Sequence, residues 1–272
     1  MQKKSYGIGE VTNLADVADQ HAEEVALQGY SIIPNLIDAA ELQNWRTKID
    51  AVYETQETAF GKDALIGINE LDMCRAPLLY DFDFLDLATK PKVMDVIGKI
   101  LGNWFILNLQ NAIINRPNKV HHQTSWHRDL PYQNWVISKP LAINAMFAID
   151  DFSEETGGTL VLPFSHRSEN YPSQEFVNNN EHTVTMPAGS VVIFDAMLFH
   201  RAGTNKSNNI RRGVNHLYTV PILKQQYDFP KALGDQLELN SFQKQFLGYT
   251  SQVPADDRQW RENRLLKNSG TQ

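Results

Sequence analysis

The sequence predicts a mainly β protein with flanking helices, built as a sandwich or a barrel with a helical N-terminal part. In residues 1–103, apolar side chains recur at the spacing of one helix face. From about Trp104 onward, the pattern changes to short β-prone runs separated by turn residues such as Gly157-Gly158. Short strands at this spacing favour a sandwich or barrel over alternating strand–helix units.

Capping and turn residues place the elements of the N-terminal part. Gly29 is suited to end a first helix, and Asp38 is suited to begin a second as its N-cap. Pro91 at the first position and Gly102 just past the end indicate the bounds of a third helix. The predicted elements are a helix from Leu14 to Gly29, a strand at 30–33 closed by Pro34, a helix after Asp38 carrying Leu42, Trp45, Ile49 and Val52 on one face, and a helix at 91–101.

Six β-prone runs follow, and the chain then returns to mixed helical character. We interpret residues 1–272 as one domain, with a helical buttress at 1–103, a β core at 104–220 and a C-terminal lid or packing segment at 221–272. The run Asn178-Asn179-Asn180 is interpreted as a polar loop. The predicted strands are 105–114, 141–149, 159–162, 182–186, 190–194 and 211–220.

Composition excludes several classes of protein. The 25 basic and 32 acidic residues give a net charge of -7, which disfavours a nucleic-acid partner. Cys74 is the only cysteine, so neither an intramolecular disulfide nor a multi-cysteine zinc site can form. The sequence has neither a secretory signal nor an apolar run long enough to cross a bilayer, and we therefore expect a cytoplasmic protein without a membrane partner.

The segment Ser125-Trp126-His127-Arg128-Asp129 carries the first candidate metal ligands. On an extended strand, His127 and Asp129 project from the same face and could occupy adjacent positions around a metal. His200, which follows an apolar run and opens a polar loop, is the best candidate for a third ligand. Two histidines and one carboxylate with open positions are the signature of non-haem Fe(II) oxygenases.

Arg211 lies shortly after His200, at the start of a predicted strand. An arginine at a strand start is commonly a solvated edge charge. Next to a metal site, however, its guanidinium could pair with a carboxylate of a small dicarboxylic acid.

Together these motifs resemble the phytanoyl-CoA dioxygenase family of Fe(II)/2-oxoglutarate oxygenases over roughly residues 22–250. The motifs match that family in their residue types and also in their order and spacing. The matching segments are Gly29 to Pro34, His127-Arg128-Asp129, Ala148 to Asp151, Gly157 to Leu160, Leu162 to His166, Gly189 to Asp195, His200 and Arg211.

The resemblance implies a double-stranded β-helix, which is a cupin-like jelly roll, and a set of residue roles. His127, Asp129 and His200 would bind Fe(II), and Arg211 would hold the distal carboxylate of 2-oxoglutarate. Further cosubstrate contacts are expected from Thr159, Ser125 and Asn144. The implied reaction uses O2, converts 2-oxoglutarate to succinate and CO2, and hydroxylates a small metabolite or natural-product intermediate.

Substrate contacts are expected from Gln110, Tyr132 and Trp135, which lie on or next to the strands that carry the site. The sequence also departs from the family. Ala202 stands where a serine is common in the family. Phe164 replaces the glycine of the usual Pro-Gly-Ser-His turn. We do not interpret His166, the last residue of this turn, as a metal ligand. Asp129 occupies the position that halogenating relatives leave to a small residue, which favours hydroxylation or a related oxidation.

Two other functions are compatible with the same ligands. One is a metal-binding jelly roll without oxygenase activity, and the other is a zinc-dependent hydrolase or isomerase that activates water. A water-activating site has no need of Arg211. The sequence does not distinguish a monomer from a homodimer and does not identify the substrate.

Overall fold

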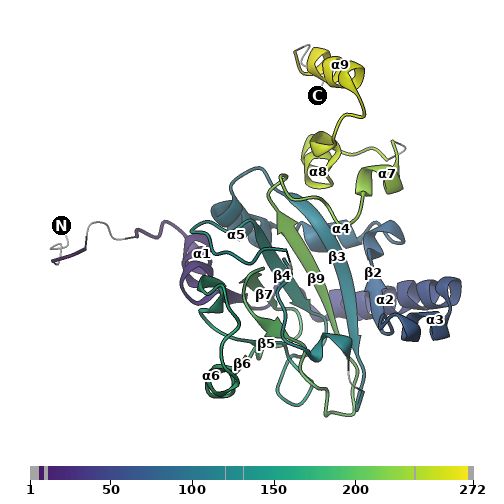
Figure 1. Cartoon of the computed structure of the whole chain (residues 1–272). Coiled ribbons are helices and arrows are strands. Elements are labelled where there is room, and N and C mark those ends of the chain that lie inside the picture. Colours follow the sequence, from purple (N-terminus) through teal and green to yellow (C-terminus); the bar gives the residue numbers. More distant parts are fainter. Residues whose placement is uncertain (1–5, 9–11, 120, 131, 236, 269–272) are drawn as a thin grey trace.

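The computed structural model describes residues 6–8, 12–119, 121–130, 132–235 and 237–268. Two antiparallel sheets form its centre (Figure 1): a large sheet ordered β1-β7-β4-β9-β3-β2 and a small sheet ordered β6-β5-β8. The strands are β1 (Tyr30–Ile33), β2 (Met73–Arg75), β3 (Ile106–Asn115), β4 (Ala142–Ala148), β5 (Leu160–Val161), β6 (His182–Thr183), β7 (Val191–Asp195), β8 (His200–Arg201) and β9 (Arg211–Thr219).

This arrangement confirms the predicted mainly β fold with flanking helices. Each of the six predicted runs contains a strand, although those in the small sheet are only two residues long. The sheets do not join into a closed barrel, because the large sheet ends at β1 and β2 and the small sheet has only three strands. The helices are α1 (Val17–Gln28), α2 (Ala39–Phe60), α3 (Lys62–Gly67), α4 (Phe84–Ala88), α5 (Pro91–Leu101), α6 (Gln174–Asn180), α7 (Phe229–Leu233), α8 (Ser241–Phe246) and α9 (Asp257–Asn268).

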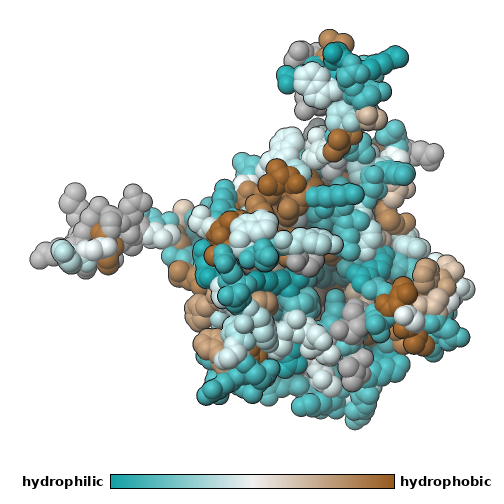
Figure 2. Space-filling model, viewed as in Figure 1, coloured by the Kyte–Doolittle hydropathy of each residue, from teal (hydrophilic) through white to brown (hydrophobic). Residues whose placement is uncertain are grey.

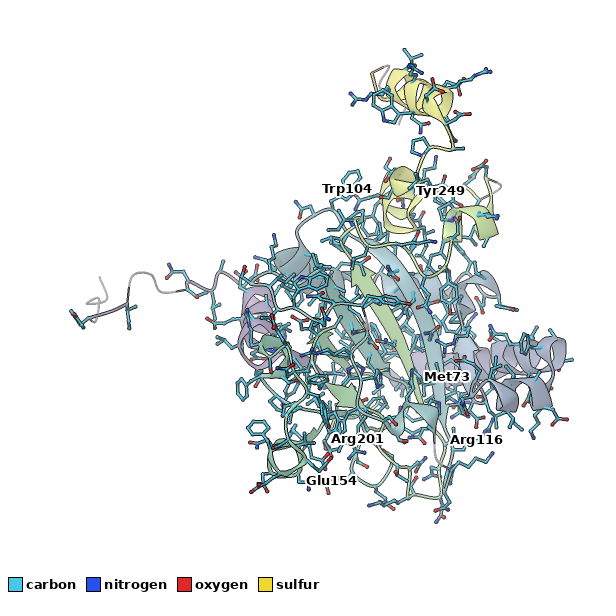
Figure 3. The ribbon with its side chains drawn as sticks, in the orientation of Figure 1. Met73, Trp104, Arg116, Glu154, Arg201 and Tyr249 are labelled. Atoms are coloured by element: carbon cyan, nitrogen blue, oxygen red, sulfur yellow. The ribbon has the colours of Figure 1, made fainter. Side chains whose placement is uncertain are left out.

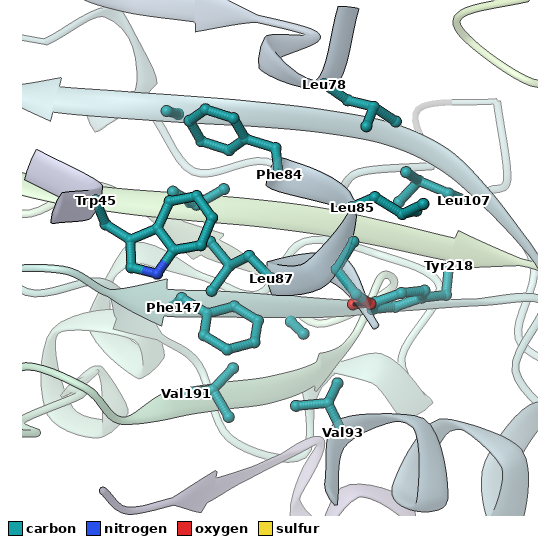
Figure 4. Close-up of a cluster of buried hydrophobic side chains, with 14 of the residues drawn as sticks. Trp45, Leu78, Phe84, Leu85, Leu87, Val93, Leu107, Phe147, Val191 and Tyr218 are labelled. Carbon is teal, nitrogen blue, oxygen red and sulfur yellow. Dashed lines mark hydrogen bonds between the residues drawn. The ribbon is translucent and has the colours of Figure 1, made fainter. Parts of the chain in front are cut away.

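The N-terminal helices cover one face of the large sheet and form the main hydrophobic core (Figure 4). Trp45 of α2 and Phe84 of α4 pack with Phe147 of β4 and Tyr218 of β9. Successive side chains of a strand point to opposite faces. On β9, therefore, Val214, His216 and Tyr218 face this core, while Arg211, Gly213 and Asn215 face the small sheet. The two-residue alternation of the strands thus separates the stabilising core from a polar interior.

Local chemistry explains most helix boundaries. Asp16 and Asp19 form a reciprocal capping box at the start of α1, which ends at Gly29 with a φ of 94°. The side chain of Asp38 accepts a hydrogen bond from Glu41 N at the start of α2. The prediction of a loop at 178–180 was wrong, because these asparagines end α6, which begins where the Ser173 hydroxyl accepts from Phe176 N.

The C-terminal segment packs on the body only in its first half. Phe229 of α7 and Phe246 of α8 are buried in the main core. α9 stands apart from the body in Figure 1, and its Trp260 is half exposed. The face shown in Figure 2 is mostly hydrophilic, with scattered hydrophobic side chains. None of the helices in the described ranges combines the length and the apolar character that crossing a membrane requires.

Candidate metal centre

Backbone hydrogen bonds join the two sequence stretches that carry the predicted metal ligands. His127 and His200 each donate an amide hydrogen to the carbonyl of the other, at 3.0 and 3.1 Å. Asp129 N donates to Ala196 O at 3.0 Å. The His-x-Asp segment therefore lies against β8, the strand that begins with His200. Residues distant in the sequence are held side by side by backbone, not by side-chain packing alone.

The three side chains converge on one point. His127 Nε2 and His200 Nε2 each lie 3.7 Å from an oxygen of Asp129, and one ligand atom from each residue falls within 4.8 Å of the others. The Nδ1 atoms are engaged by backbone carbonyls, His127 with Ser125 O at 2.9 Å and His200 with Leu198 O at 3.0 Å. Each Nε2 is thereby left to face the centre.

The chemistry of this donor set fits a divalent metal ion. Asp129 Oδ2 is buried and has no hydrogen-bond partner among the described residues. Burial lowers the pKa of His200, which favours the neutral imidazole that binds metals. The edge-on ring of Phe194, 4.8 Å from the His200 ring, restricts its orientation. Two neutral imidazoles and one carboxylate suit iron, zinc or another first-row metal.

Arg128, the middle residue of the His-x-Asp motif, points away from the centre and anchors the motif. Its Nε donates to Met197 O at 2.7 Å, and its guanidinium lies 3.8 Å above the ring of Phe199. It also donates to the carbonyls of Ser165 and Ser168. This role was not predictable from the sequence, since the three carbonyls come from other turns of the chain.

A cavity adjoins the three ligands and extends between the two sheets. Arg211 and Thr159 both line it, so the structure brings these two predicted cosubstrate residues together with the metal ligands. Figure 3 labels two further lining residues, Met73 of β2 and Arg201 of β8. Ala202, which stands where the family often has serine, also lines the cavity. The remaining lining residues, which sequence reasoning did not assign to the site, are Asn111, Ile113, Gln123, Met146 and Asn215. Strand alternation counted from Arg211 could have identified Asn215.

Arg211 is a buried cation in this cavity. It is 2% exposed, its Nη2 donates to Gly157 O at 2.6 Å, and its guanidinium lies 4.5 Å from the centre of the Phe152 ring. Its Nε has no hydrogen-bond partner, and no carboxylate in the described part of the chain forms an ion pair with it. Burial lowers the pKa of Arg211 from its ordinary value to about 10. An anionic ligand bound to the guanidinium would offset the free-energy cost of this burial.

Gly157 brings the loop of residues 203–205 close to Arg211. Its φ is 75°, and a Cβ there would lie 2.6 Å from Gly203 O and 2.8 Å from Asn205 N. Only glycine permits this approach, which aims the carbonyl of residue 157 at the guanidinium.

The other predicted site residues lie around the cavity instead of lining it. Ser125 is exposed, and its carbonyl, not its hydroxyl, supports His127. Asn144 is fully buried behind Asn215. The amide of Gln110 donates to Phe84 O and accepts from Leu78 N, which gives it a structural position in the core. Tyr132 and Trp135, exposed by 93% and 48%, lie in the loop after the His-x-Asp motif.

In the turn at 163–166, Phe164 stands at the position where the family usually has glycine. Phe164 takes the left-handed conformation expected of the glycine, with a φ of 68°. His166 is buried, and its Nε2 lies 3.2 Å from Ala26 O, outside the ligand cluster.

Comparison with known proteins agrees with this geometry. The model of the phytanoyl-CoA dioxygenase (PhyH) family matches residues 25–213. The family match defines the chain as a member of the Fe(II)/2-oxoglutarate-dependent class of enzymes, and the fold agrees. The chain belongs to the phytanoyl-CoA dioxygenase family.

Proteins of similar sequence occur in Mycobacterium tuberculosis and in humans. An uncharacterized protein of Mycobacterium tuberculosis is 35% identical over 245 residues, covering 86% of this chain and 88% of the relative. The human peroxisomal phytanoyl-CoA dioxygenase is 24% identical over 217 residues, covering 69% and 64%.

Solved structures confirm the fold at lower identity. The epimerase SnoN of nogalamycin biosynthesis, solved with Fe3+ and alpha-ketoglutarate, has a TM-score of 0.58 at 18% identity and covers 74% of this chain and 83% of its own. The carbocyclase SnoK has a TM-score of 0.57 at 17% identity, covering 78% and 87%.

Proposed function

We propose that this protein is an Fe(II)/2-oxoglutarate-dependent dioxygenase that hydroxylates a small metabolite or natural-product intermediate. The observation that carries the proposal is the cavity that contains both the His127–Asp129–His200 cluster and the buried guanidinium of Arg211, which forms no ion pair with a carboxylate of the described residues. A site for a metal alone needs no buried cation, whereas a site for a metal and a dicarboxylate needs both. The same reasoning disfavours a zinc hydrolase and a metal-binding protein without cosubstrate.

His127, Asp129 and His200 would hold Fe(II), and their neutral and anionic donors leave the other coordination positions open. When bound, the iron would supply the activation of O2 that is coupled to conversion of 2-oxoglutarate to succinate and CO2. The chain's own residues position the reactants. Arg211 binds the distal carboxylate of 2-oxoglutarate, and Thr159 offers a hydroxyl nearby. Arg128 and the paired backbone of 127 and 200 keep the ligands rigid.

Hydroxylation is the outcome that Asp129 favours, because its carboxylate occupies the position that a halide would need. The substrate would enter past the loop that carries Tyr132 and Trp135, whose exposed aromatic surfaces are available for contact. SnoN and SnoK are named as an epimerase and a carbocyclase. Epimerisation or ring closure is therefore the second candidate outcome for this site.

We further propose a cytoplasmic location and a small-molecule substrate, with neither nucleic acid nor membrane as a partner. The net charge of -7 and the single cysteine support this proposal. Burial raises the pKa of Cys74 to about 12, so its thiol is unreactive.

Anaerobic binding followed by exposure to O2 tests the proposal. Fe(II) and then 2-oxoglutarate should produce the visible charge-transfer band of a metal-bound keto acid, and O2 should then yield succinate. Arg211→Met should weaken 2-oxoglutarate binding at least tenfold, about the loss of one charged hydrogen-bonded pair. Arg212→Met is the matched control, because Arg212 points outward to Asp50 and Asp150. Absence of the band in the wild-type protein would contradict the proposal.

A further inference from the structure

Two asparagines near the metal ligands, Asn144 buried and Asn215 half-buried, satisfy each other's hydrogen bonds only in part. Asn215 of β9 donates its Nδ2 to Asn144 Oδ1 of β4 at 2.9 Å. Asn144 is 0% exposed. Asn144 Nδ2 and Asn215 Oδ1 are buried and have no hydrogen-bond partner among the described residues. Buried polar atoms without partners are rare in folded proteins and indicate a missing ligand or water.

The position of the pair relates it to one end of the cosubstrate. Asn215 lies directly opposite Met146 of β4 and Asn111 of β3, and all three line the cavity. Arg211 lies on the same face of the same strand, four residues earlier, which is about 13 Å along the strand. If Arg211 holds the distal carboxylate of 2-oxoglutarate, the keto-acid end points away from Arg211 and toward the row of Asn215.

The amide nitrogen of Asn215 can donate to two partners at once. Each side-chain amide nitrogen carries two hydrogens. One hydrogen of Asn215 Nδ2 is donated to Asn144 Oδ1, which leaves the second to donate to a ligand in the cavity that Asn215 lines. The oxygens of a bound keto acid can only accept hydrogen bonds, so they suit this donor.

We propose that Asn215 donates a hydrogen bond to the keto-acid end of 2-oxoglutarate, and that Asn144 is a positioning residue that holds the Asn215 donor toward the cavity. This inference rests on the proposed function. It gives Asn144 an indirect role, since the Asn215 side chain lies between Asn144 and the cavity.

A double-mutant cycle tests whether Asn144 acts through Asn215. The dissociation constant of 2-oxoglutarate is measured from the visible band of the anaerobic Fe(II) protein. Asn215→Ala and Asn144→Leu should each raise it roughly tenfold. In the double variant, Asn144→Leu should add no further loss, because its partner is already gone. If the two losses multiply, or if either single variant binds like the wild type, the inference is overturned.

Two further measurements separate this role from a general structural one. The ratio of the dissociation constants for 2-oxobutyrate, which lacks the distal carboxylate, and 2-oxoglutarate should be unchanged in both single variants and should collapse in Arg211→Met. Mn(II) affinity should be unchanged, since the ligands are untouched, and a loss of Mn(II) affinity in the single variants would overturn the inference. If Asn144→Leu does not fold, Asn144→Val takes its place in the cycle. Loss of the band in the wild-type protein would instead refute the proposed function itself.

Discussion

Replacing Arg211 by methionine should remove cosubstrate binding without the large loss of stability that truncating a buried side chain usually brings. Burial lowers the pKa of Arg211 from its ordinary value to about 10. This shift corresponds to about 3 kcal/mol of destabilisation of the charged form in the folded protein. The hydrogen bond to Gly157 O and the contact with the Phe152 ring offset roughly 2 kcal/mol of it. Methionine retains most of the apolar volume.

The metal-free Arg211→Met protein should therefore be equal to the wild type in free energy of unfolding, or about 1 kcal/mol more stable. Urea unfolding at pH 7.5 measures this difference. A second series contains Mn(II) and 2-oxoglutarate at 100 times the wild-type dissociation constant. There the wild type should gain about 2.7 kcal/mol from the cosubstrate, and the variant, which binds it at least tenfold more weakly, should gain at most about 1.4 kcal/mol.

Two results would refute this reasoning. If the free energy of unfolding of the variant is lower than that of the wild type by about 2 kcal/mol or more, the substitution behaves as an ordinary cavity-forming one. A variant with wild-type stabilisation by 2-oxoglutarate would show that the carboxylate binds elsewhere.

Three other substitutions test further parts of the structure. Gly157→Ala should cost about 2–4 kcal/mol in urea unfolding, because the new Cβ would lie 2.6 Å from Gly203 O at a φ of 75°; a cost below about 1 kcal/mol would show that the loop yields. Phe164→Gly should raise the unfolding free energy by up to about 1 kcal/mol, because Phe164 holds a φ of 68° while its side chain is exposed; a loss above about 1 kcal/mol would show that the exposed ring stabilises the turn. Burial lowers the pKa of His216 to about 3, so between pH 6.5 and 3 the unfolded chain binds a proton that the folded protein does not, and stability falls as the pH falls. Between pH 7.5 and 5, His216→Leu should abolish about 2 kcal/mol of this loss of unfolding free energy in the metal-free protein. If variant and wild type differ in unfolding free energy by the same amount at both pH values, the pH dependence does not come from His216.

Local signals explain why much of the fold could be predicted. The N-cap Asp38 and Gly29, which ends α1, act within one or two helical turns. Apart from β2, the strands of the large sheet are long enough to show in the sequence. α6 was missed because a run of asparagines is a poor helix signal, and it depends on one hydroxyl, that of Ser173.

The residues of the candidate site that were predicted and that line its cavity are the ones that a motif carried. The His-x-Asp spacing, the distal histidine and Arg211 have fixed residue types in a known order. Asn215 and Arg128 act through partners from distant strands and turns, and these partners are set by sheet register. β2 has three residues and β8 has two, too few for a periodic pattern, so the walls of the cavity that they form were invisible in the sequence.

The location of a bound metal tests the central claim most directly. A crystal of the full chain grown with Mn(II) and 2-oxoglutarate, measured at the manganese absorption edge, gives the metal position independently of any reaction. We predict one anomalous peak between His127, Asp129 and His200, with the keto acid reaching from it toward Arg211. A peak elsewhere, or a His200 ring turned away from the other two ligands, would contradict the account.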